Sequence, residues 1–429
     1  MGGSGLSFYL TKYKVGEVAS VQTGPFGSQL HKEDYVERGT PIITVEHLGE
    51  NRIIHDNTPF VSEDDVKRLS KYSLEKGDIV FSRVGSVDRR AYVSNKEEGW
   101  LFSGRCLRVR VTNKSLVDPI FLSYYFGLEN FKEYVRNIAV GATMPSLNTK
   151  IMTGLEIEVP ELGYQHQIAK TLKSLDDKIE LNNAINKNLE EMAQALFKRW
   201  FVDFEFPNEN GEPYKSSGGD MEWCEELEKE IPKGWTSDKI GNCTKLVSRG
   251  IAPKYVDNSE KRVINQKCIR NGMLNVALSR THSSKVNEEK QLQFGDVLIN
   301  STGTGTLGRV AQVYEHLDNF TVDSHVTIVR SNVNNGLGYM GCLLKSMQPI
   351  FEHAATGSTG QTELGREVIK QMPILLPEQK MIDKFSGIYH SICTKMILIQ
   401  KNNVVLSNTR DTLLPKLMSG EIRVPLDQA

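Results

Sequence analysis

Two long stretches of the chain carry apolar residues at alternating spacings of three and four, the spacing that predicts a helix with one apolar face. The first stretch covers residues 165–201 and contains neither Gly nor Pro. About 37 residues at 1.5 Å each predict a helix of roughly 55 Å. Its apolar stripe comprises Ile168, Leu172, Leu175, Ile179, Leu189, Ala193, Leu196 and Trp200.

The second stretch, near the C-terminus, has a similar stripe, and Pro415 is expected to end or bend that helix. The stripe comprises Met381, Phe385, Ile388, Ile392, Met396, Ile399, Leu406, Leu413 and Leu417. Asn182, Asn186 and Asn403 occupy inward positions, where buried Asn is known to fix helix register. We predict that the two helices pair in antiparallel fashion and hold a domain at each end. The alternative is that each stripe packs only on its own domain.

The remaining sequence is typical of β-rich domains. Short apolar runs, Ile79–Ser82 and Val297–Asn300, each follow a Gly-Asp pair. Residues 107–111 and 326–329 alternate in a way that predicts strands, half-buried in the first case. Short helices are expected at residues 63–69 and 119–135.

The chain repeats itself once. Leu74-Glu-Lys-Gly-Asp-Ile-Val-Phe-Ser82 recurs as Leu292-Gln-Phe-Gly-Asp-Val-Leu-Ile-Asn300. Thr40-Pro-Ile-Ile-Thr44 matches Lys261-Arg-Val-Ile-Asn265, Val140-Gly-Ala-Thr143 matches Thr356-Gly-Ser-Thr359, and Ile157-Glu-Val-Pro160 matches Ile374-Leu-Leu-Pro377. We therefore expect an α+β fold with two tandem β-rich domains and two long antiparallel helices as the spacer.

The expected organisation has five parts. A first domain covers 6–160, a long helix 161–204, an acidic connector 205–230, a second domain 231–377, and the second helix with a tail 378–429.

Composition indicates a globular protein without a membrane span. The 429 residues are 39% hydrophobic and 24% charged, and no apolar run approaches the length of a membrane helix. The opening Met-Gly-Gly-Ser-Gly resembles a flexible linker and has no features of a signal peptide. Six scattered cysteines without metal-ligand spacing are typical of reduced core thiols and indicate a cytoplasmic protein.

Charge is unevenly distributed. The formal net charge is −1, but residues 205–233 hold nine acidic and three basic residues. The rest of the chain therefore has 49 basic and 44 acidic residues, a net charge of +5. This mildly basic balance permits nucleic-acid binding without requiring it.

No catalytic or metal-binding pattern stands out. Gly303-Thr-Gly-Thr-Leu-Gly308 matches a dinucleotide-binding motif, but residues 309–314 predict a strand where that site needs a helix. Asp118-Pro-Ile-Phe121 is close to a methyltransferase signature but also opens helices commonly. The histidines lack metal-ligand spacing. We expect no catalysis, metal or cofactor in this chain.

Basic and small polar residues in predicted loops are the candidate DNA-binding set, because Arg and Lys bind phosphates and Arg also reads guanine. In the first domain they are Lys32, Arg83, Ser86, Arg89, Arg90 and Arg105; in the second they are Arg249, Lys254, Lys267, Arg270, Thr304, Arg309 and His325. For any one of them a solvated surface role is an alternative, and only the set repeated in both domains carries weight.

Several motifs in order resemble the specificity subunits of type I restriction-modification enzymes. In the first half they are Gly24-Pro-Phe-Gly-Ser28, Gly77-Asp-Ile-Val80, Leu155-Glu-Ile-Glu-Val-Pro160 and the connector Phe201-Val-Asp-Phe-Glu-Phe-Pro207. In the second half they are Ile231-Pro-Lys-Gly-Trp235, Gly250-Ile-Ala-Pro-Lys-Tyr255, Gly295-Asp-Val-Leu298, Gly305-Thr-Leu-Gly-Arg309 and Leu413-Leu-Pro-Lys-Leu-Met-Ser-Gly-Glu421. The first half departs from the pattern, since it lacks a Pro-x-Gly-Trp opening.

The resemblance implies a non-catalytic subunit with two target-recognition domains, each reading half of a bipartite asymmetric DNA sequence. It implies that the helices set the gap and dock two methyltransferase subunits, and that restriction subunits join for translocation and cleavage. S-adenosylmethionine, ATP and Mg²⁺ would belong to those partners. The alternative is an adaptor whose two domains bind proteins.

Overall fold

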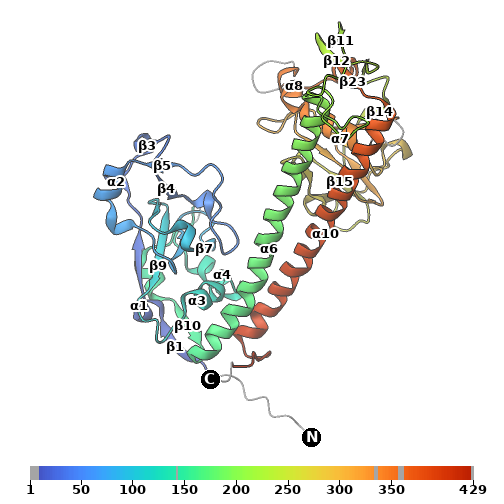
Figure 1. Cartoon of the computed structure of the whole chain (residues 1–429). Helices are drawn as coiled ribbons and strands as arrows, with labels where there is room; N and C mark the ends of the chain where they lie inside the picture. The colour runs from blue at the N-terminus through green and yellow to red at the C-terminus, as the bar shows by residue number, and fades with distance from the viewer. Residues whose placement is uncertain (1–8, 142–143, 333–336, 356–361, 427–429) are drawn as a thin grey trace. The chain divides into compact units, whose positions relative to one another are not determined.

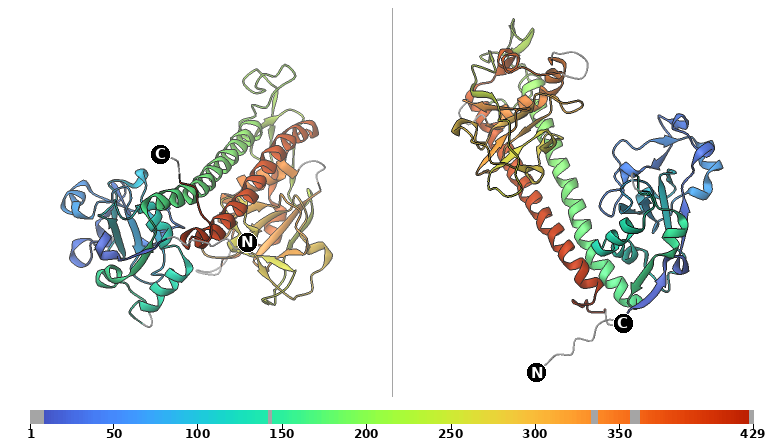
Figure 2. Two further views of the ribbon diagram at one scale, coloured as in Figure 1. Left: turned by 90° about the horizontal axis from the view of Figure 1, so that it is seen from below. Right: turned by 180° about the vertical axis from the view of Figure 1, so that it is seen from behind.

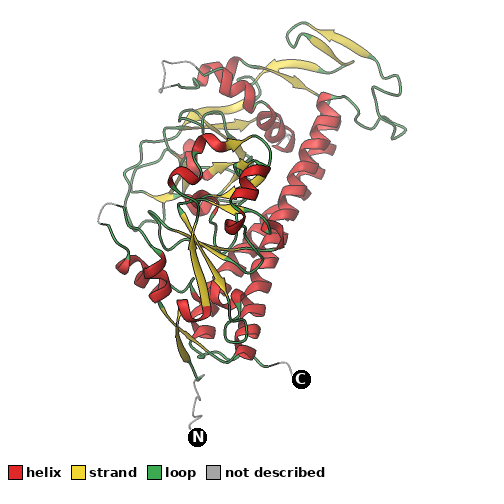
Figure 3. Ribbon diagram, turned by 90° about the vertical axis from the view of Figure 1, so that its left-hand side faces the viewer, coloured by secondary structure: helices red, strands yellow, loops and turns green. Residues whose placement is uncertain are grey.

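The protein forms two compact units. The structure, a computed structural model, describes residues 9–141, 144–332, 337–355 and 362–426. The first unit runs to Leu181 and includes the segment from Asn403 onward, and the second covers Asn182–Asn402. Outside the long helices, most of the chain is strand and loop (Figure 3). The domain limits drawn from the sequence remain predictions.

A four-stranded antiparallel sheet organises the first unit. Its order is β2-β9-β6-β7, and its strands are Ala19–Thr23, Cys106–Val111, Ile79–Ser82 and Arg90–Tyr92. One face packs on the helices α3 (Pro119–Tyr125), α4 (Glu129–Ile138) and α5 (Thr149–Gly154) and on part of each long helix. The other face covers a second core, which explains why every residue of β6 is buried.

The second core of this unit lies under a small mixed sheet. Its order is β3-β5-β4-β8, from Tyr35–Val36, Phe60–Val61, Thr40–Ile43 and Leu101–Phe102, with β4 and β8 parallel. The helix α2 (Glu63–Arg68) follows β5, and its first turn is capped by Ser62. A separate antiparallel pair joins β1 (Thr11–Lys14) to β10 (Glu156–Val159), so the domain begins and closes at one place.

The second unit repeats this topology. Its central sheet has the order β14-β22-β19-β20, from Thr244–Arg249, Val326–Ser331, Val297–Asn300 and Val310–Gln312. A small sheet again contains a parallel pair, β15 (Arg262–Ile264) with β21 (Phe320–Val322), and β18 (Arg280–Thr281) lies on its edge. The pair β13 (Thr236–Lys239) with β23 (Pro373–Leu376) closes this domain. Figure 1 labels β14, β15 and β23.

The shared strand order confirms that the chain is an internal repeat of one fold. The predicted strands at Ile79–Ser82 and Val297–Asn300 are confirmed, as are the helices predicted at residues 63–69 and within 119–135. The repeat pieces at residues 142–143 and 356–359 lie outside the described residues.

The Gly-Asp motif of the repeat has a structural cause. Asp78 accepts hydrogen bonds from Nε and Nη2 of Arg110, both at 2.7 Å, and Asp296 accepts the same two bonds from Arg330 at 2.8 Å. Asp78 and Asp296 are both buried, each with 1% residue exposure. The strand predicted at residues 107–111 is confirmed, but it is not half-buried, because Arg108 on its other face is only 7% exposed.

The two long helices are α6 (Leu162–Phe197) and α10 (Gln379–Met418), and each contributes to both units (Figure 2). Their pairing is antiparallel. In the first unit Asp176 bonds Arg410, and in the second Asn182 donates to Asn402 at 3.0 Å while Asn186 donates to the carbonyl of Met396 at 3.3 Å. A π-helical turn, Lys198–Val202, extends α6, and α10 continues three residues past Pro415.

The residues of the predicted stripes differ in burial. Ile168, Leu172, Met381 and Phe385 are buried, and Leu175, Ile179, Leu189, Leu196, Ile392, Ile399 and Leu406 are partly buried. Ile388 is 43% exposed, so its assignment to the packed face is wrong. The adjacent Tyr389, 1% exposed, takes the inward position.

The acidic connector contains an antiparallel hairpin of β11 (Met221–Cys224) and β12 (Lys229–Pro232). Phe206, at the start of the connector, stacks on Trp235 with ring centroids 4.9 Å apart, which fixes that segment to the second unit. All six cysteines are buried and free. None of the helices in the described ranges combines the length and hydropathy of a membrane-spanning segment.

Candidate nucleic-acid interface

In the first unit several loops converge beyond the end of β6. The amide of Arg83 donates to the carbonyl of Arg105 at 2.8 Å, and the amide of Leu147 donates to the carbonyl of Arg83 at 2.8 Å. A Cβ on Gly24 would lie 2.1 Å from the carbonyl oxygen of Ser103, so the segment after β2 lies directly against the loop that contains Ser103. Four chain segments that are distant in sequence thus form one loop cluster.

The predicted side chains of this cluster differ in accessibility. Ser86 and Arg105 are exposed, whereas Arg83 and Arg89 are partly buried. The guanidinium of Arg83 donates to the carbonyl of Gly104 at 3.1 Å, and that of Arg89 donates to the carbonyl of Leu48. These backbone contacts orient both guanidinium groups. Lys32 begins a short 3-10 helix, Lys32–Asp34, and its side chain lies outside the described residues.

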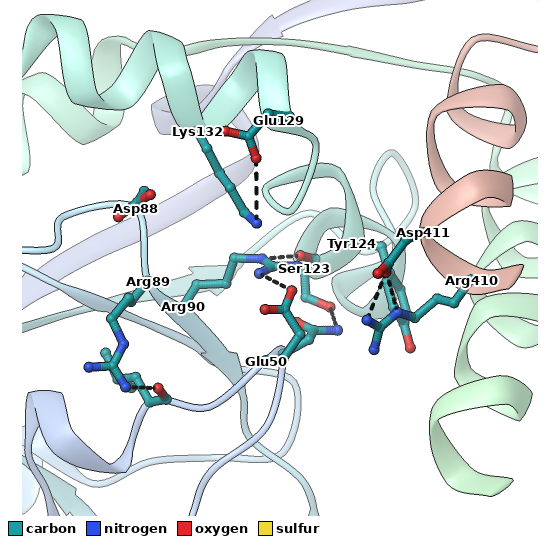
Figure 4. Close-up of polar contacts among 12 residues, drawn as sticks. Glu50, Asp88, Arg89, Arg90, Ser123, Tyr124, Glu129, Lys132, Arg410 and Asp411 are labelled. Atoms are coloured by element: carbon teal, nitrogen blue, oxygen red, sulfur yellow. Dashed lines mark hydrogen bonds and ion pairs between the residues drawn. The ribbon is translucent and has the colours of Figure 1, made fainter. Parts of the chain in front are cut away.

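Arg90 does not belong to this surface. Its side chain is 4% exposed, its Nε donates to the carbonyl of Ser123 at 2.9 Å, and its Nη1 lies 3.5 Å from Glu50 (Figure 4). Burial lowers the pKa of the guanidinium, and the Glu50 carboxylate opposes that shift. The assignment of Arg90 to a DNA-binding surface is therefore wrong in this structure, because the β7 strand directs it into the core.

The second unit builds the same cluster with different residues. The amide of Ser301 donates to the carbonyl of His325 at 2.8 Å, and the amide of Leu364 donates to the carbonyl of Ser301 at 2.8 Å. These bonds match those of Arg83 with Arg105 and Leu147. The backbone frame is therefore conserved between the two units, while the side chains on it change.

Thr304 and His325 are exposed in this second cluster, and Arg309 is partly buried. His325 Nδ1 lies 2.8 Å from the Thr302 hydroxyl, and Arg309 donates to the carbonyl of Gly305 at 2.7 Å. The buried Asp323 accepts the amide of His325 at 2.9 Å, and burial raises the pKa of that carboxyl. Hydrogen-bonding groups thus face outward from a turn held by its own backbone.

The other predicted residues of the second unit lie around its small sheet. Lys254, Lys267 and Arg270 are exposed. Arg249 is partly buried, forms an ion pair with Glu363 at 2.7 Å and donates to the carbonyl of Leu364 at 3.1 Å. Arg249 therefore connects β14 to the loop cluster instead of presenting a free guanidinium.

Two motifs that resembled catalytic sites have structural explanations. The glycine motif at residues 303–308 is a turn that leads into the strand β20, which lies within the strand predicted at residues 309–314. Asp118 caps α3 through the amide of Phe121 at 2.7 Å, which confirms its interpretation as a helix opener. Among the described residues, no cluster of His, Cys, Asp or Glu could hold a metal ion.

Two exposed aromatic residues were missing from the sequence prediction. Phe26 is 60% exposed and lies under the Arg83 guanidinium, 5.8 Å from the ring centroid. Tyr255 is 39% exposed, and the guanidinium of Arg280 lies 3.5 Å from its ring centroid. Both belong to motifs that follow a glycine, Gly24 and Gly250, but nothing in the sequence distinguishes an exposed ring from a core ring.

Comparison with known proteins finds similar specificity subunits. Residues 10–191 match the family model described as the type I restriction modification DNA specificity domain. The MjaIX specificity subunit of a type I restriction enzyme from Methanocaldococcus jannaschii is 28% identical over 424 residues, which is 96% of this chain and 93% of that protein. Over nearly its whole length the chain is similar to a type I specificity subunit, and residues 10–191 match the DNA specificity domain.

Other known proteins show the same similarity. The HindI specificity subunit from Haemophilus influenzae is 24% identical and matches 87% of this chain and 92% of that protein. In structure, the chain is similar to the type I restriction-modification S subunit from M. genitalium, with a TM-score of 0.58, 17% identity, and coverage of 97% and 98% of the two chains. That likeness confirms the predicted fold class, two α+β domains with helical spacers.

The matched family model describes a DNA specificity domain, and the similar proteins are specificity subunits of type I restriction enzymes. The loop clusters are the parts of the two units where side chains vary on a common frame. They are therefore the candidate interface with DNA.

Proposed function

We propose that each unit of this specificity subunit binds one half of a bipartite, asymmetric DNA sequence through its loop cluster. The observation that supports this proposal is the common backbone frame with different side chains, Arg83 and Arg105 in one unit against Ser301 and His325 in the other. Guanidinium groups, hydroxyls and imidazoles offer different donors and acceptors to the base edges. Two half-sites of different sequence follow from this difference.

The long helices are proposed to dock two methyltransferase subunits. Large apolar side chains are exposed on them: Leu181, Val404 and Val405 in the first unit, and Met192 and Leu398 in the second, each 54–62% exposed. Apolar side chains in water favour a protein partner. In this proposal the methyltransferase subunits bind S-adenosylmethionine, and further restriction subunits bind ATP and Mg²⁺ and join for translocation and cleavage.

The experiment that tests this function is a single-molecule methylome of the source cells with and without the gene. Loss of adenine methylation at one two-part motif on deletion is the expected result, and it would reveal both half-sites. An unchanged methylome in cells that have an active methyltransferase partner would contradict the proposal.

The alternative, an adaptor whose units bind proteins, makes a different prediction about salt. DNA binding through several phosphates should weaken steeply as salt rises, with a linear dependence of the logarithm of the binding constant on the logarithm of salt concentration. Weak, salt-independent binding of the purified chain to duplex DNA would favour the adaptor.

A further inference from the structure

The segment after the first strand of each central sheet is held in the same way in both units. Gly24 follows β2, and Gly250 follows β14. A Cβ on Gly24 would lie 2.1 Å from the carbonyl oxygen of Ser103, and one on Gly250 would lie 1.8 Å from that of Val322. Only glycine permits such a close approach, so both segments leave the sheet from a fixed point beside the loop cluster.

Each of these segments presents one aromatic ring to solvent. Phe26 follows its glycine by two residues and is 60% exposed, and Tyr255 follows by five residues and is 39% exposed. An exposed ring adds little to folding stability, because its apolar surface stays in contact with water. Both units thus place an exposed ring in the segment that follows the anchoring glycine, although at different distances from it, and this exposure indicates a role outside the core.

Each ring is also paired with an arginine from another segment. Arg83, from the loop after β6, lies over Phe26 at 5.8 Å, and its buried Nε finds no acceptor among the described residues. Arg280, in β18, lies over Tyr255 at 3.5 Å. Cation–π contact orients a guanidinium on the ring while its remaining donors stay available.

The charges around the rings indicate what covers them. Arg105 is exposed beside the turn that carries Arg83, and Lys254 is exposed next to Tyr255. An apolar ring among cationic side chains is complementary to duplex DNA, where phosphates surround base edges with apolar groups such as the thymine methyl.

We propose that Phe26 and Tyr255 are specificity-determining residues, each contacting bases of one half-site with its ring while the paired arginine binds a phosphate or a guanine. This inference rests on the proposed function. Apolar side chains contact thymine methyl groups or insert between base pairs. Because the two rings differ in polarity and in distance from the anchoring glycine, they favour different bases in the two half-sites.

The test is selection of preferred sequences from a random duplex DNA library. The full chain is purified from its source cells together with the proteins that accompany it, as wild type, Phe26→Ala and Tyr255→Ala. We expect Phe26→Ala to lose about tenfold or more of its discrimination at one or two positions of one half-site, and Tyr255→Ala to do so only in the other. Tyr255→Phe should keep whatever discrimination comes from the ring.

Matched controls are exposed aromatic residues elsewhere in the same units. Tyr134→Ala in α4, 44% exposed in the wild type, and Trp223→Ala in β11, 58% exposed, should leave both half-sites unchanged. Thermal unfolding of every variant checks that the fold is intact, and Phe26→Leu serves as a second variant at that position.

The outcomes separate this inference from the proposed function. If wild type selects a bipartite motif and both alanine variants select the same motif, or lose affinity equally for all sequences, the inference is wrong and the proposed function stands. If wild type selects no sequence at all, both are overturned.

Discussion

Arg110 donates two parallel hydrogen bonds to the buried carboxylate of Asp78, both at 2.7 Å, and the two residues lie 32 positions apart in the sequence. The pair joins the strand β9 to the turn that precedes β6, and these two strands are the inner strands of the central sheet. Arg330 and Asp296 form the same pair in the second unit. The Gly-Asp sequence therefore recurs in the chain because its aspartate forms the same ion pair in both units.

Breaking this pair should destabilise the first unit. Asp78→Asn keeps the side-chain shape but leaves the Arg110 guanidinium without its buried partner, so we expect a loss of roughly 3 kcal/mol. Urea unfolding followed by fluorescence measures the change. Glu75→Gln is the matched control, because Glu75 pairs with the same arginine but is 62% exposed, and its loss should be within about 1 kcal/mol. Equal effects of the two substitutions would contradict this explanation.

The environment of Arg90 predicts a packing effect at Gly127. A Cβ at this position would lie 1.9 Å from Nη2 of Arg90, so Gly127→Ala must displace a buried guanidinium. We expect a loss of about 1–3 kcal/mol in the free energy of unfolding. Gly154→Ala is the control, since no atom lies within 4 Å of its Cβ position. If the two variants unfold at the same urea concentration, Arg90 can move without a loss in the free energy of unfolding.

Buried thiols should be unreactive at neutral pH. Burial raises the pKa of Cys106 and Cys342 to about 12 and of Cys243 and Cys393 to about 11. At pH 8 these groups are almost entirely protonated, so alkylation by iodoacetamide should be slow in the folded chain and fast in urea. Rapid modification of any of the four in the folded chain would contradict the burial.

The same shifts predict the direction of a pH effect on stability. Thiols in the unfolded chain lose their protons near pH 9, below the raised values of the folded chain. The contribution of the buried thiols to folding stability is therefore complete below pH 9, and it is lost as pH rises toward 11–12. Thermal unfolding between pH 8 and pH 10.5 measures this loss. Cys106→Ser should make the melting temperature fall less steeply with pH.

Arg309 provides a test of the predicted DNA surface in the second unit. Its guanidinium donates to the Gly305 carbonyl at 2.7 Å and lies on an outward turn. We expect Arg309→Ala to weaken binding to one half-site about tenfold, with the melting temperature intact. Lys384→Ala, an exposed cation on α10, is the control. Unchanged affinity of the Arg309 variant for both half-sites would show that this residue is not part of the DNA-binding surface.

The helices provide a test of the proposed gap between half-sites. Inserting seven residues after Asn186 in α6, with seven matching residues after Leu398 in α10, keeps the apolar stripes in phase. Two added turns lengthen the helix pair by about 10 Å, or roughly three base pairs. The methylated motif should therefore gain about three unspecified positions and keep both half-sites. The same insertion in the connector after Asn210 should change nothing, and an unchanged gap in the helix variant would refute this role.

The sequence alone determined the repeated strands and the two long helices. These features follow from local periodicity, since Ile79–Ser82 and Val297–Asn300 are largely apolar runs and residues 165–201 contain neither Gly nor Pro. The order of family motifs also predicted the family. Such features depend on neighbouring residues and are visible in the chain itself.

Tertiary structure decided which side chains of each pattern face the core. Arg89 and Arg90 are adjacent and chemically identical, but only Arg90 lies in β7 and points to Ser123 and Glu50. Likewise Tyr389 replaces Ile388 on the inward face of α10, because a helix of 3.6 residues per turn drifts from a strict 3.5-residue pattern. The partners of Phe26 and Tyr255 come from distant segments, so the exposed ring–arginine pairs exist only in the folded chain.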